Sequence, residues 1–337
     1  MKPKHFGRLV LFLLLFTMVL SQFFYNCVVA EAQTITLTVS HVLGTTHPYQ
    51  PGFEKMAEIV EARTNGEIKF KIFHSASLAE EEEAIEALQM GTIDITTVSA
   101  APLTGFVKEY MACDFPFMFS SPQEAFNFYD GEIGDILLEK TTPIGLIGLC
   151  WWENGFRNLT NSIRPIISPE DMKGLKIRTM NSPVHMASVR ALGASAVPIA
   201  FGELYSALQQ GVVDGQENPV ANIHAMRFYE VQKYLTLTRH FHDPSPTFIS
   251  AKTWNKLSEE QRKIIKEASI EARDYMRQLG IDQEDSLIED LKKNGMEVID
   301  LTPEQLDAFK EATKNVWKDF EDKIGKDFLD KFLNALP

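Results

Sequence analysis

The chain has 337 residues and a formal net charge of −13 at pH 7. This acidic balance argues against nucleic acid or an anionic membrane surface as a partner, because both attract basic proteins. The length exceeds what one hydrophobic core usually holds, so we expect two lobes.

The N-terminus has the features of an export signal. Basic residues precede Leu9 to Leu20, an almost wholly apolar run that is short for crossing a bilayer. Ala30-Glu31-Ala32 matches an Ala-x-Ala cleavage pattern. We therefore predict that residues 1–32 are a signal peptide, cleaved near Ala32, and that the mature protein is periplasmic with a net charge of −15.

The cysteines leave alternatives open. A lipid anchor on Cys27 is disfavoured by Asn26, because a small residue is expected there, and the short apolar run disfavours an uncleaved membrane anchor. Cys113 and Cys150 could pair in an oxidising compartment, or they could stay as buried free thiols.

The first part of the mature chain alternates strands with helices. A β-branched segment with period two predicts a strand, and Asn65-Gly66 predicts the end of a helix. The predicted elements are a strand at 34–40, a helix at 51–64, a strand at 67–73, a helix at 78–90 and a strand at 93–98. This order predicts an α/β fold with a sheet rich in parallel strands.

Later helices have explicit start signals. A hydroxyl at the cap is followed three positions later by a carboxylate or amide that can reach back to it. The predicted caps are Ser121, Ser168, Ser258 and Thr302, all except Ser258 with proline at the first helical position.

The helix that follows Ser258 continues without a strong breaker to Asn294, and only Gly280 interrupts it. At about 1.5 Å per residue it would span ~55 Å, which is longer than one lobe is wide. We therefore expect this helix to cross both lobes, which are interleaved in sequence.

Common signatures of hydrolases, metalloproteases and nucleotide-binding sites are missing from the sequence. His240-Phe241-His242-Asp243 could bind a metal, but surface or hydrogen-bonded histidines on a polar-facing strand are the favoured interpretation. Glu80 to Glu83 begin a helix, where carboxylates suit the positive helix end, although Glu81 could point into a cleft. We predict no cofactor and no metal.

Two arginines are candidate binding residues. Arg178 ends a short apolar strand, Arg157 lies upstream of it, and the chain then returns to a polar turn at 214–218. A guanidinium matches a carboxylate with two parallel hydrogen bonds, and ligands of open α/β sheets collect beyond strand ends. These residues predict a site for a small carboxylate. The alternative for either arginine is a structural ion pair.

Trp151 and Trp152 precede Arg157. Because side chains alternate along a strand, only one of them can face a cleft. We assign Trp152 to the pocket wall and the other tryptophan to the core.

A set of motifs in this region resembles a known family, the extracytoplasmic solute-binding proteins of TRAP transporters, of the C4-dicarboxylate-binding type. The resemblance covers essentially the whole mature chain. The motifs are Asn-Gly-Phe-Arg-Asn-Leu-Thr (154–160), Asp-Met-Lys-Gly-Leu-Lys-Ile-Arg (171–178), Leu-Gly-Ala (192–194), Glu-Leu-Tyr-Ser-Ala-Leu-Gln (203–209) and Val-Asp-Gly-Gln-Glu-Asn-Pro (213–219).

The resemblance implies a two-lobed periplasmic binding protein fold in which a long helix spans both lobes and the lobes close over one ligand. We expect the first lobe to comprise residues 33–154 and 244–283, and the second to comprise 155–243 and 284–337. The implied function is that of a monomeric periplasmic receptor that delivers a small organic acid to the membrane permease subunits of a TRAP transporter.

The resemblance also implies the ligand residues. Arg178 corresponds to the family's carboxylate-binding arginine and Arg157 to a second ligand arginine. Asn218 corresponds to a ligand asparagine, and Phe201 to an aromatic that lines the pocket. The strand end at His41 and the helix start at Glu81 fall in regions that select the ligand.

Ser99 narrows the range of possible ligands, because the sialic-acid binders of the family have glutamate at this position. Sialic acid is therefore disfavoured. C4-dicarboxylates, sugar acids such as uronates, and other small organic acids remain as possible ligands. His41, His47 and Glu81 would suit hydroxyl groups, which favours a sugar acid. The alternative function is an exported enzyme that acts on a carboxylated substrate, with Glu81 or His41 as acid or base.

Overall fold

The computed structural model describes residues 34–337, so the predicted signal peptide and Cys27 lie outside the described residues. The strands are β1 (Ile35–Ser40), β2 (Ile68–Phe73), β3 (Ile95–Thr97), β4 (Leu146–Asn161), β5 (Lys176–Thr179), β6 (Ser195–Pro198), β7 (Gly215–Pro219), β8 (Tyr234–Ser250) and β9 (Glu297–Asp300).

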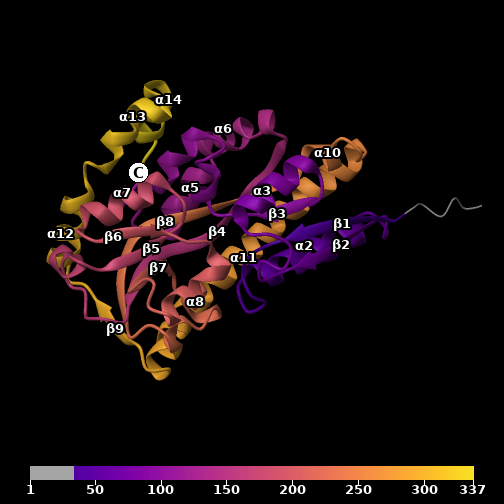
Figure 1. The fold of residues 1–337 in the computed structure, drawn as a ribbon. Helices are drawn as coiled ribbons and strands as arrows, with labels where there is room; N and C mark the ends of the chain where they lie inside the picture. Colours follow the sequence, from indigo (N-terminus) through magenta and orange to yellow (C-terminus); the bar gives the residue numbers. More distant parts are fainter. Residues whose placement is uncertain (1–33) are drawn as a thin grey trace, which may run out of the picture.

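Helices surround these strands (Figure 1). The α-helices are α2 (Tyr49–Arg63), α3 (Glu81–Met90), α4 (Ala100–Leu103), α5 (Pro122–Tyr129), α6 (Glu132–Lys140), α7 (Pro183–Ala191), α8 (Leu204–Gln209), α9 (Val220–Ala225), α10 (Ala251–Trp254), α11 (Glu259–Lys293), α12 (Pro303–Thr313), α13 (Glu321–Ile324) and α14 (Lys326–Asn334). The 3-10 helices are η1 (Lys108–Asp114), η2 (Thr142–Ile144), η3 (Pro169–Met172), η4 (Phe201–Glu203), η5 (Phe228–Glu230) and η6 (Val316–Phe320).

The α/β alternation predicted for the first part of the chain is confirmed. β1 pairs in parallel with both β2 and β3. Helix α3 begins at Glu81, later than predicted, because Glu80 is the N-cap and forms a capping box with Glu83. Helix α2 ends where Asn65 and Gly66 adopt positive φ angles.

One sheet joins the two halves of the molecule through its two longest strands, β4 and β8. The strand order is β2-β1-β3-β8-β4-β7-β5-β6, with β9 beside β8. β8 pairs with β3 through its last residues and with β9 through its first residues, while β4 pairs with β7 through its last residues. We call the region of β1, β2, β3 and α3 the β1–β3 side, and the region of β5, β6, β7 and η4 the β5–β7 side.

The β4–β8 ladder is irregular near its middle. The register shifts between Glu153 and Gly155, and Gly155 has a φ of 124°, which side chains with a Cβ rarely adopt. Gly155 lies opposite Asp243. The lobe boundaries that we expect, at 154/155 and 243/244, fall at this bulge, and the division itself stays a prediction.

The long helix α11 is confirmed as one helix that begins after a capping box of Ser258 and Gln261. It packs on α2, on β4 and on α9, so it contacts elements from both ends of the sheet (Figure 1). The caps at Ser121, Ser168 and Thr302 are also confirmed, although Ser168 begins a 3-10 helix.

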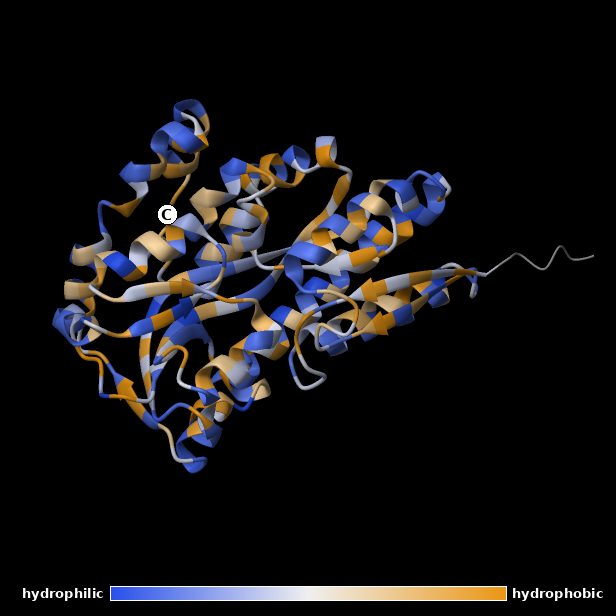
Figure 2. Ribbon diagram, in the orientation of Figure 1, coloured by the Kyte–Doolittle hydropathy of each residue, from blue (hydrophilic) through white to orange (hydrophobic). Residues whose placement is uncertain are grey.

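Apolar residues lie between the sheet and its helices, and polar residues lie on the outer faces of the helices (Figure 2). The largest core cluster joins α2, β1, β4 and α11, and a second one joins α3, η1, α5 and α6 with the C-terminal helices. Phe332 of α14 packs on Phe115 and Phe128. No helix within residues 34–337 is long and apolar enough to cross a membrane.

The two described cysteines are free. Cys113 and Cys150 are both buried, and they belong to different core clusters. Of the two alternatives left by the sequence, the structure has the buried thiols, and burial raises the pKa of both.

Candidate functional site

Six of the predicted ligand residues surround one small cavity between the β1–β3 side and the β5–β7 side. Its walls come from strand ends and helix starts on both sides. The lining residues are Val42, Leu43, Tyr49, Glu81, Ser99, Asn154, Arg157, Arg178, Met180, Phe201, Asn218 and Asn222. This inner cavity has a volume of about 10 Å³, room for a single water, so the cleft is closed here.

A larger outer cavity of about 460 Å³ lies beside it and opens to solvent. Glu81, Arg178, Met180 and Phe201 line both cavities and therefore form the wall between them. A ligand that reaches Arg178 must contact this wall.

Arg178 is a buried cation without a counterion. It lies in β5 and is 2% exposed, and its Nε donates to the carbonyl oxygen of Ile199 at 2.8 Å. Within residues 34–337 its Nη1 has no hydrogen-bond partner, and no carboxylate lies within ion-pair distance. Burial, and then the charge of Arg157, lower the pKa of Arg178 to about 10, so it stays protonated at neutral pH.

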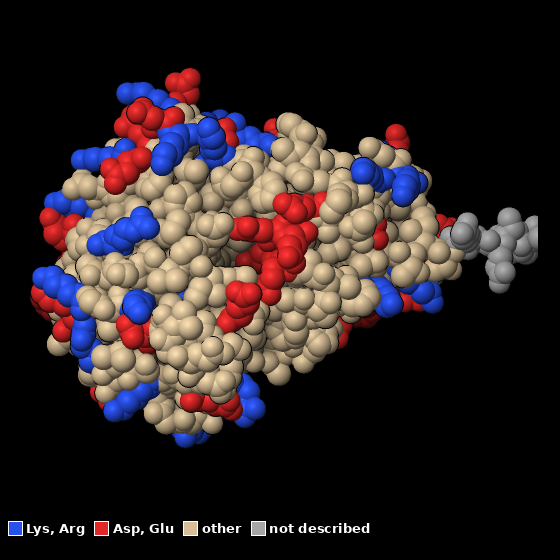
Figure 3. Space-filling model, in the orientation of Figure 1, with Lys and Arg blue, Asp and Glu red and all other residues tan. Residues whose placement is uncertain are grey.

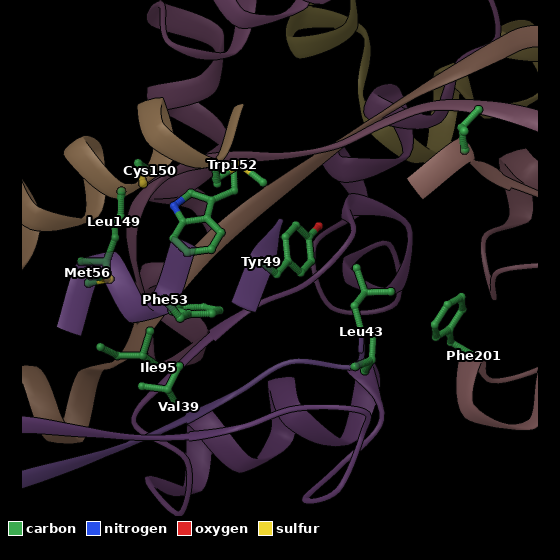
Figure 4. Close-up of a cluster of buried hydrophobic side chains, with 14 of the residues drawn as sticks. Val39, Leu43, Tyr49, Phe53, Met56, Ile95, Leu149, Cys150, Trp152 and Phe201 are labelled. Carbon is green, nitrogen blue, oxygen red and sulfur yellow. The ribbon is translucent and has the colours of Figure 1, made fainter. Parts of the chain in front are cut away.

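Phe201 begins η4 and places its ring 5.9 Å from the guanidinium carbon of Arg178. The ring supplies an aromatic face to the cation. It lies apart from the main group of aromatic core residues, near Leu43 (Figure 4). The ring thereby contacts one face of the guanidinium, while Nη1 remains available as a donor.

Arg157, by contrast, is paired with two buried carboxylates. Its Nε and Nη2 donate to the carboxylate of Glu217 at 2.5 and 2.8 Å, and its Nη1 donates to Asp243 at 2.6 Å. Nη2 also donates to the carbonyl oxygen of Glu217. Burial alone would lower the pKa of Arg157, but the two carboxylates outweigh it and raise that pKa. The structural ion pair that the sequence left open for either arginine is present at Arg157.

A chain of hydrogen bonds connects this ion pair to the opposite side of the cavity. Asp243 accepts from Asn154 Nδ2 at 2.8 Å and from Ser99 Oγ at 3.2 Å. The backbone N–H of Ser99 donates to Glu81 Oε1 at 2.7 Å. Burial raises the pKa of Glu81 to about 7, because the charged form is poorly solvated there.

Asn218 lies in β7, which the sequence analysis took for a polar turn. That prediction is wrong, because residues 215–219 form a buried strand paired with β4. The polar side chains of this strand are tolerated because they are hydrogen-bonded: Asn218 donates to Gln216 at 2.5 Å and accepts from Asn222 at 3.2 Å.

Trp152 lines neither cavity, so the prediction that it forms the pocket wall is wrong. It is fully buried, and its ring packs on Phe53 and Tyr49 (Figure 4). Both tryptophans are buried, because a helix covers each face of β4 at this point: Trp152 donates to the Ser269 carbonyl of α11 and Trp151 to the Gly134 carbonyl of α6.

His41 lies behind the cavity. It is 1% exposed, its ring stacks on Phe53, and its Nε2 shares a hydrogen bond with Gln50 at 3.0 Å. Burial lowers the pKa of His41 to about 4, so the ring is neutral at pH 7. The structure thus places this residue in support of the first strand end, without a direct face on the cavity.

Three further residues belong to this hydrogen-bonded network, Asn154, Glu217 and Asp243. Asn154 and Glu217 lie within motifs that carry the family resemblance but were not predicted as ligand residues, and Asp243 was weighed only with the two histidines as a possible metal ligand. No group of residues in the described chain could hold a metal ion. His240 and His242 are buried and hydrogen-bonded, to Thr238 and to Glu153. Of the two alternatives in the favoured interpretation, surface or hydrogen-bonded histidines, the structure has the hydrogen-bonded one, and β8 is buried at these positions.

Two contacts cross the mouth of the outer cavity. Glu80, at the N-cap of α3, accepts a hydrogen bond from the backbone N–H of Gly202 at 3.1 Å. Its neighbour Glu82 accepts from Asn181 Nδ2 at 2.9 Å. These contacts join the β1–β3 side to the β5–β7 side and stabilise the closed cleft.

Gly202→Ala is expected to weaken ligand binding about fivefold, the equivalent of one lost hydrogen bond of ~1 kcal/mol. A Cβ at this position would lie 2.1 Å from Glu80 Oε1, so the contact must open. Calorimetric titration of both proteins checks this. Glu80→Ser, which keeps a good N-cap residue, provides the matched background. Gly202→Ala should have little further effect there, and an equal loss in both backgrounds would contradict the role of this contact.

Comparison with known proteins gives a consistent result. The model of the family "bacterial extracellular solute-binding protein, family 7" matches residues 39–323. A solute-binding protein of Verminephrobacter eiseniae is 39% identical over 91% of this chain and 90% of its own length.

Solved structures of TRAP periplasmic solute-binding proteins have the same fold. One from Polaromonas, bound to D-erythronate, is 38% identical with a TM-score of 0.85 and covers 89% of this chain and 98% of its own. One from Sulfurospirillum deleyianum, with bound succinate, is 32% identical with a TM-score of 0.86 and covers 90% of this chain and 99% of its own. The fold, the interlobe cavity with its buried arginines and these similarities agree, and the chain belongs to the family 7 extracellular solute-binding proteins, the two-lobed periplasmic binding proteins of TRAP transporters.

Proposed function

We propose that this protein is a periplasmic receptor that binds a small organic acid anion between its two lobes and delivers it to the membrane permease of a TRAP transporter. In this proposal Arg178 binds the ligand carboxylate, and the ligand is surrounded by Phe201, Asn218, Glu81 and Ser99. Related proteins bind D-erythronate and succinate, so the ligand class is a sugar acid or a dicarboxylate.

The observation that carries this proposal is the charge of Arg178. A buried guanidinium without a counterion is costly, because it has lost its water and gained no opposite charge. A ligand carboxylate at its free N–H groups would supply two parallel hydrogen bonds and restore the balance. The same cost in the unliganded protein makes the open cleft, where water can reach Arg178, the better apo state.

Closure of the two lobes follows from the difference between Arg178 with and without a ligand carboxylate. A ligand shifts the equilibrium only if it binds the closed state more tightly than the open one. Contacts with Arg178 and Asn218 on one side and with Glu81 and Ser99 on the other would give that preference. α11 would bend during closure, and Gly280 is the position where bending is cheapest.

We expect saturating ligand to make the protein more compact and to stabilise it by about 2.7 kcal/mol at a free concentration of 100 Kd. Small-angle scattering and thermal unfolding, with D-erythronate, galactonate and succinate as probes, test this. Identical radii of gyration with and without a bound probe would favour a rigid, preformed pocket.

The export route and the partner are parts of the same proposal. The family is extracytoplasmic, which fits cleavage of the signal peptide near Ala32 and a monomer that is free to reach the permease. The alternative, an exported enzyme, would convert its bound probe. Mass spectrometry of a probe recovered after long incubation separates the two, because a receptor returns it unchanged.

A further inference from the structure

The inner cavity offers one carboxylate clamp only. A guanidinium has five N–H donors. Arg157 donates four hydrogen bonds to Glu217 and Asp243. Arg178 uses a single one, to Ile199, and its fork remains available. A second carboxylate on the ligand would therefore find no second free guanidinium in the cavity wall.

The other polar groups of the wall are mainly acceptors. Glu81 accepts from Ser99 through Oε1, and its second oxygen takes part in no hydrogen bond in the described chain. Asn154 turns its Nδ2 toward the Asp243 carboxylate, which fixes the amide orientation and leaves Oδ1 without a partner among residues 34–337. A ligand satisfies these acceptors with donors, and hydroxyl groups are donors whereas carboxylates are not.

The electrostatic potential around the site also favours a ligand with a single carboxylate. Glu217 and Asp243 outnumber Arg157, the one cation with which both of them pair, so this cluster adds negative charge to that of Glu81 on the wall that Arg178 faces. The outer cavity is lined by Glu80, Glu82, Glu83 and Glu203, and acidic side chains gather in the hollow of this face near α3 (Figure 3). One carboxylate pairs with Arg178, but a second would enter a negative environment.

We infer that the ligand is a hydroxylated monocarboxylate, an aldonate or a uronate, and that Glu81 is the residue that rejects anions with a second carboxylate. This inference rests on the proposed function, because it assumes that Arg178 holds the first carboxylate. It assigns Glu81 two effects, acceptance of a ligand hydroxyl and repulsion of a second carboxylate. Specificity of this kind combines an attractive and a repulsive element.

The test is calorimetric titration of the wild-type protein at about pH 8, above the pKa of about 7 of Glu81, so that this carboxyl is ionised. The probes are D-erythronate and galactonate, and succinate and fumarate, which lack hydroxyl groups. We expect the preferred hydroxy acid to bind at least about tenfold more tightly than either dicarboxylate. The free energy needed to place two like charges together is larger than the free energy that corresponds to a tenfold change in Kd. Glu81→Gln removes the charge at nearly constant shape. It should bring the two classes to within a few fold of each other, with a gain for the dicarboxylates and a loss for the hydroxy acids.

Glu86→Gln is the matched control, because Glu86 lies exposed on the same helix, lines neither cavity and undergoes the same chemical change. Its selectivity should equal that of the wild type. Succinate or fumarate binding as tightly as the hydroxy acids to the wild type would overturn the ligand class and leave the receptor function intact. Unchanged selectivity in Glu81→Gln would overturn the role of Glu81. Failure of all four anions to bind a folded wild-type protein would overturn the proposed function itself.

Discussion

Arg157→Gln should lower the free energy of unfolding by about 3–5 kcal/mol, the usual cost of removing one partner from a buried ion pair. Glu217 and Asp243 would be left as buried carboxylates without their cation. Arg157 holds the pKa of Glu217 below its usual range against the effect of burial, so the substitution also forces this carboxyl to take up a proton or to be solvated. Urea unfolding at pH 7 measures the loss as a lower midpoint.

The control for this experiment lies in the same cavity. Arg178→Gln changes the same residue type at the same depth, but it leaves no carboxylate without a partner, since Arg178 has no ion pair in the described chain. We expect its unfolding free energy to stay within about 1 kcal/mol of the wild type or to rise. Adding Glu217→Gln to Arg157→Gln should recover part of the loss. Equal destabilisation by the two arginine variants would show that both are structural.

Arg178→Lys is expected to weaken binding of the organic acid by ~1.5–3 kcal/mol, the range for a hydrogen bond to a charged group. Lysine keeps the positive charge but loses the planar fork that gives a carboxylate two parallel hydrogen bonds. It also loses the flat contact with Phe201, which lies 5.9 Å from the guanidinium carbon. Calorimetric titration with the best-binding probe gives the affinity, and thermal unfolding without ligand verifies that the fold is unchanged.

Arg178→Gln should go further than the lysine variant, because it removes the charge as well as the fork. Binding should then be lost over the concentration range in which the wild type saturates. A variant that binds as tightly as the wild type would mean that the carboxylate is held elsewhere. Arg157 would be an unsuitable substitute, because four hydrogen bonds to Glu217 and Asp243 already occupy it.

The sequence left a structural ion pair open for either arginine, and the structure has such a pair at Arg157 and none at Arg178 within residues 34–337. Both follow apolar residues in strands, and the resemblance to the family assigned a ligand role to each. Their difference lies in residues that are remote in the chain. Arg157 pairs with Glu217, 60 residues away, and with Asp243, 86 residues away. With many carboxylates in the chain, no local pattern identifies which of them reaches which arginine.

The sequence by itself determined the elements whose signals are local. Helix α11 begins where Ser258 and Gln261, three residues apart, bond each other's backbone groups, and such a cap is readable without tertiary structure. Strand β1 was readable from its alternation of apolar and polar residues. The motifs from Asn154 to Pro219 identified the family and marked Arg178 as the candidate for binding a carboxylate.

Only the tertiary structure decided what depends on pairing between distant segments. The length of β4 and β8 comes from their mutual ladder, and the buried strand β7 comes from pairing with β4, which satisfies polar residues that otherwise resemble a turn. The place of Trp152 in the core depends on the helices that cover β4. A local sequence pattern records hydrogen bonds between near neighbours, whereas burial and ion pairing are set by whichever remote segments the fold brings into contact.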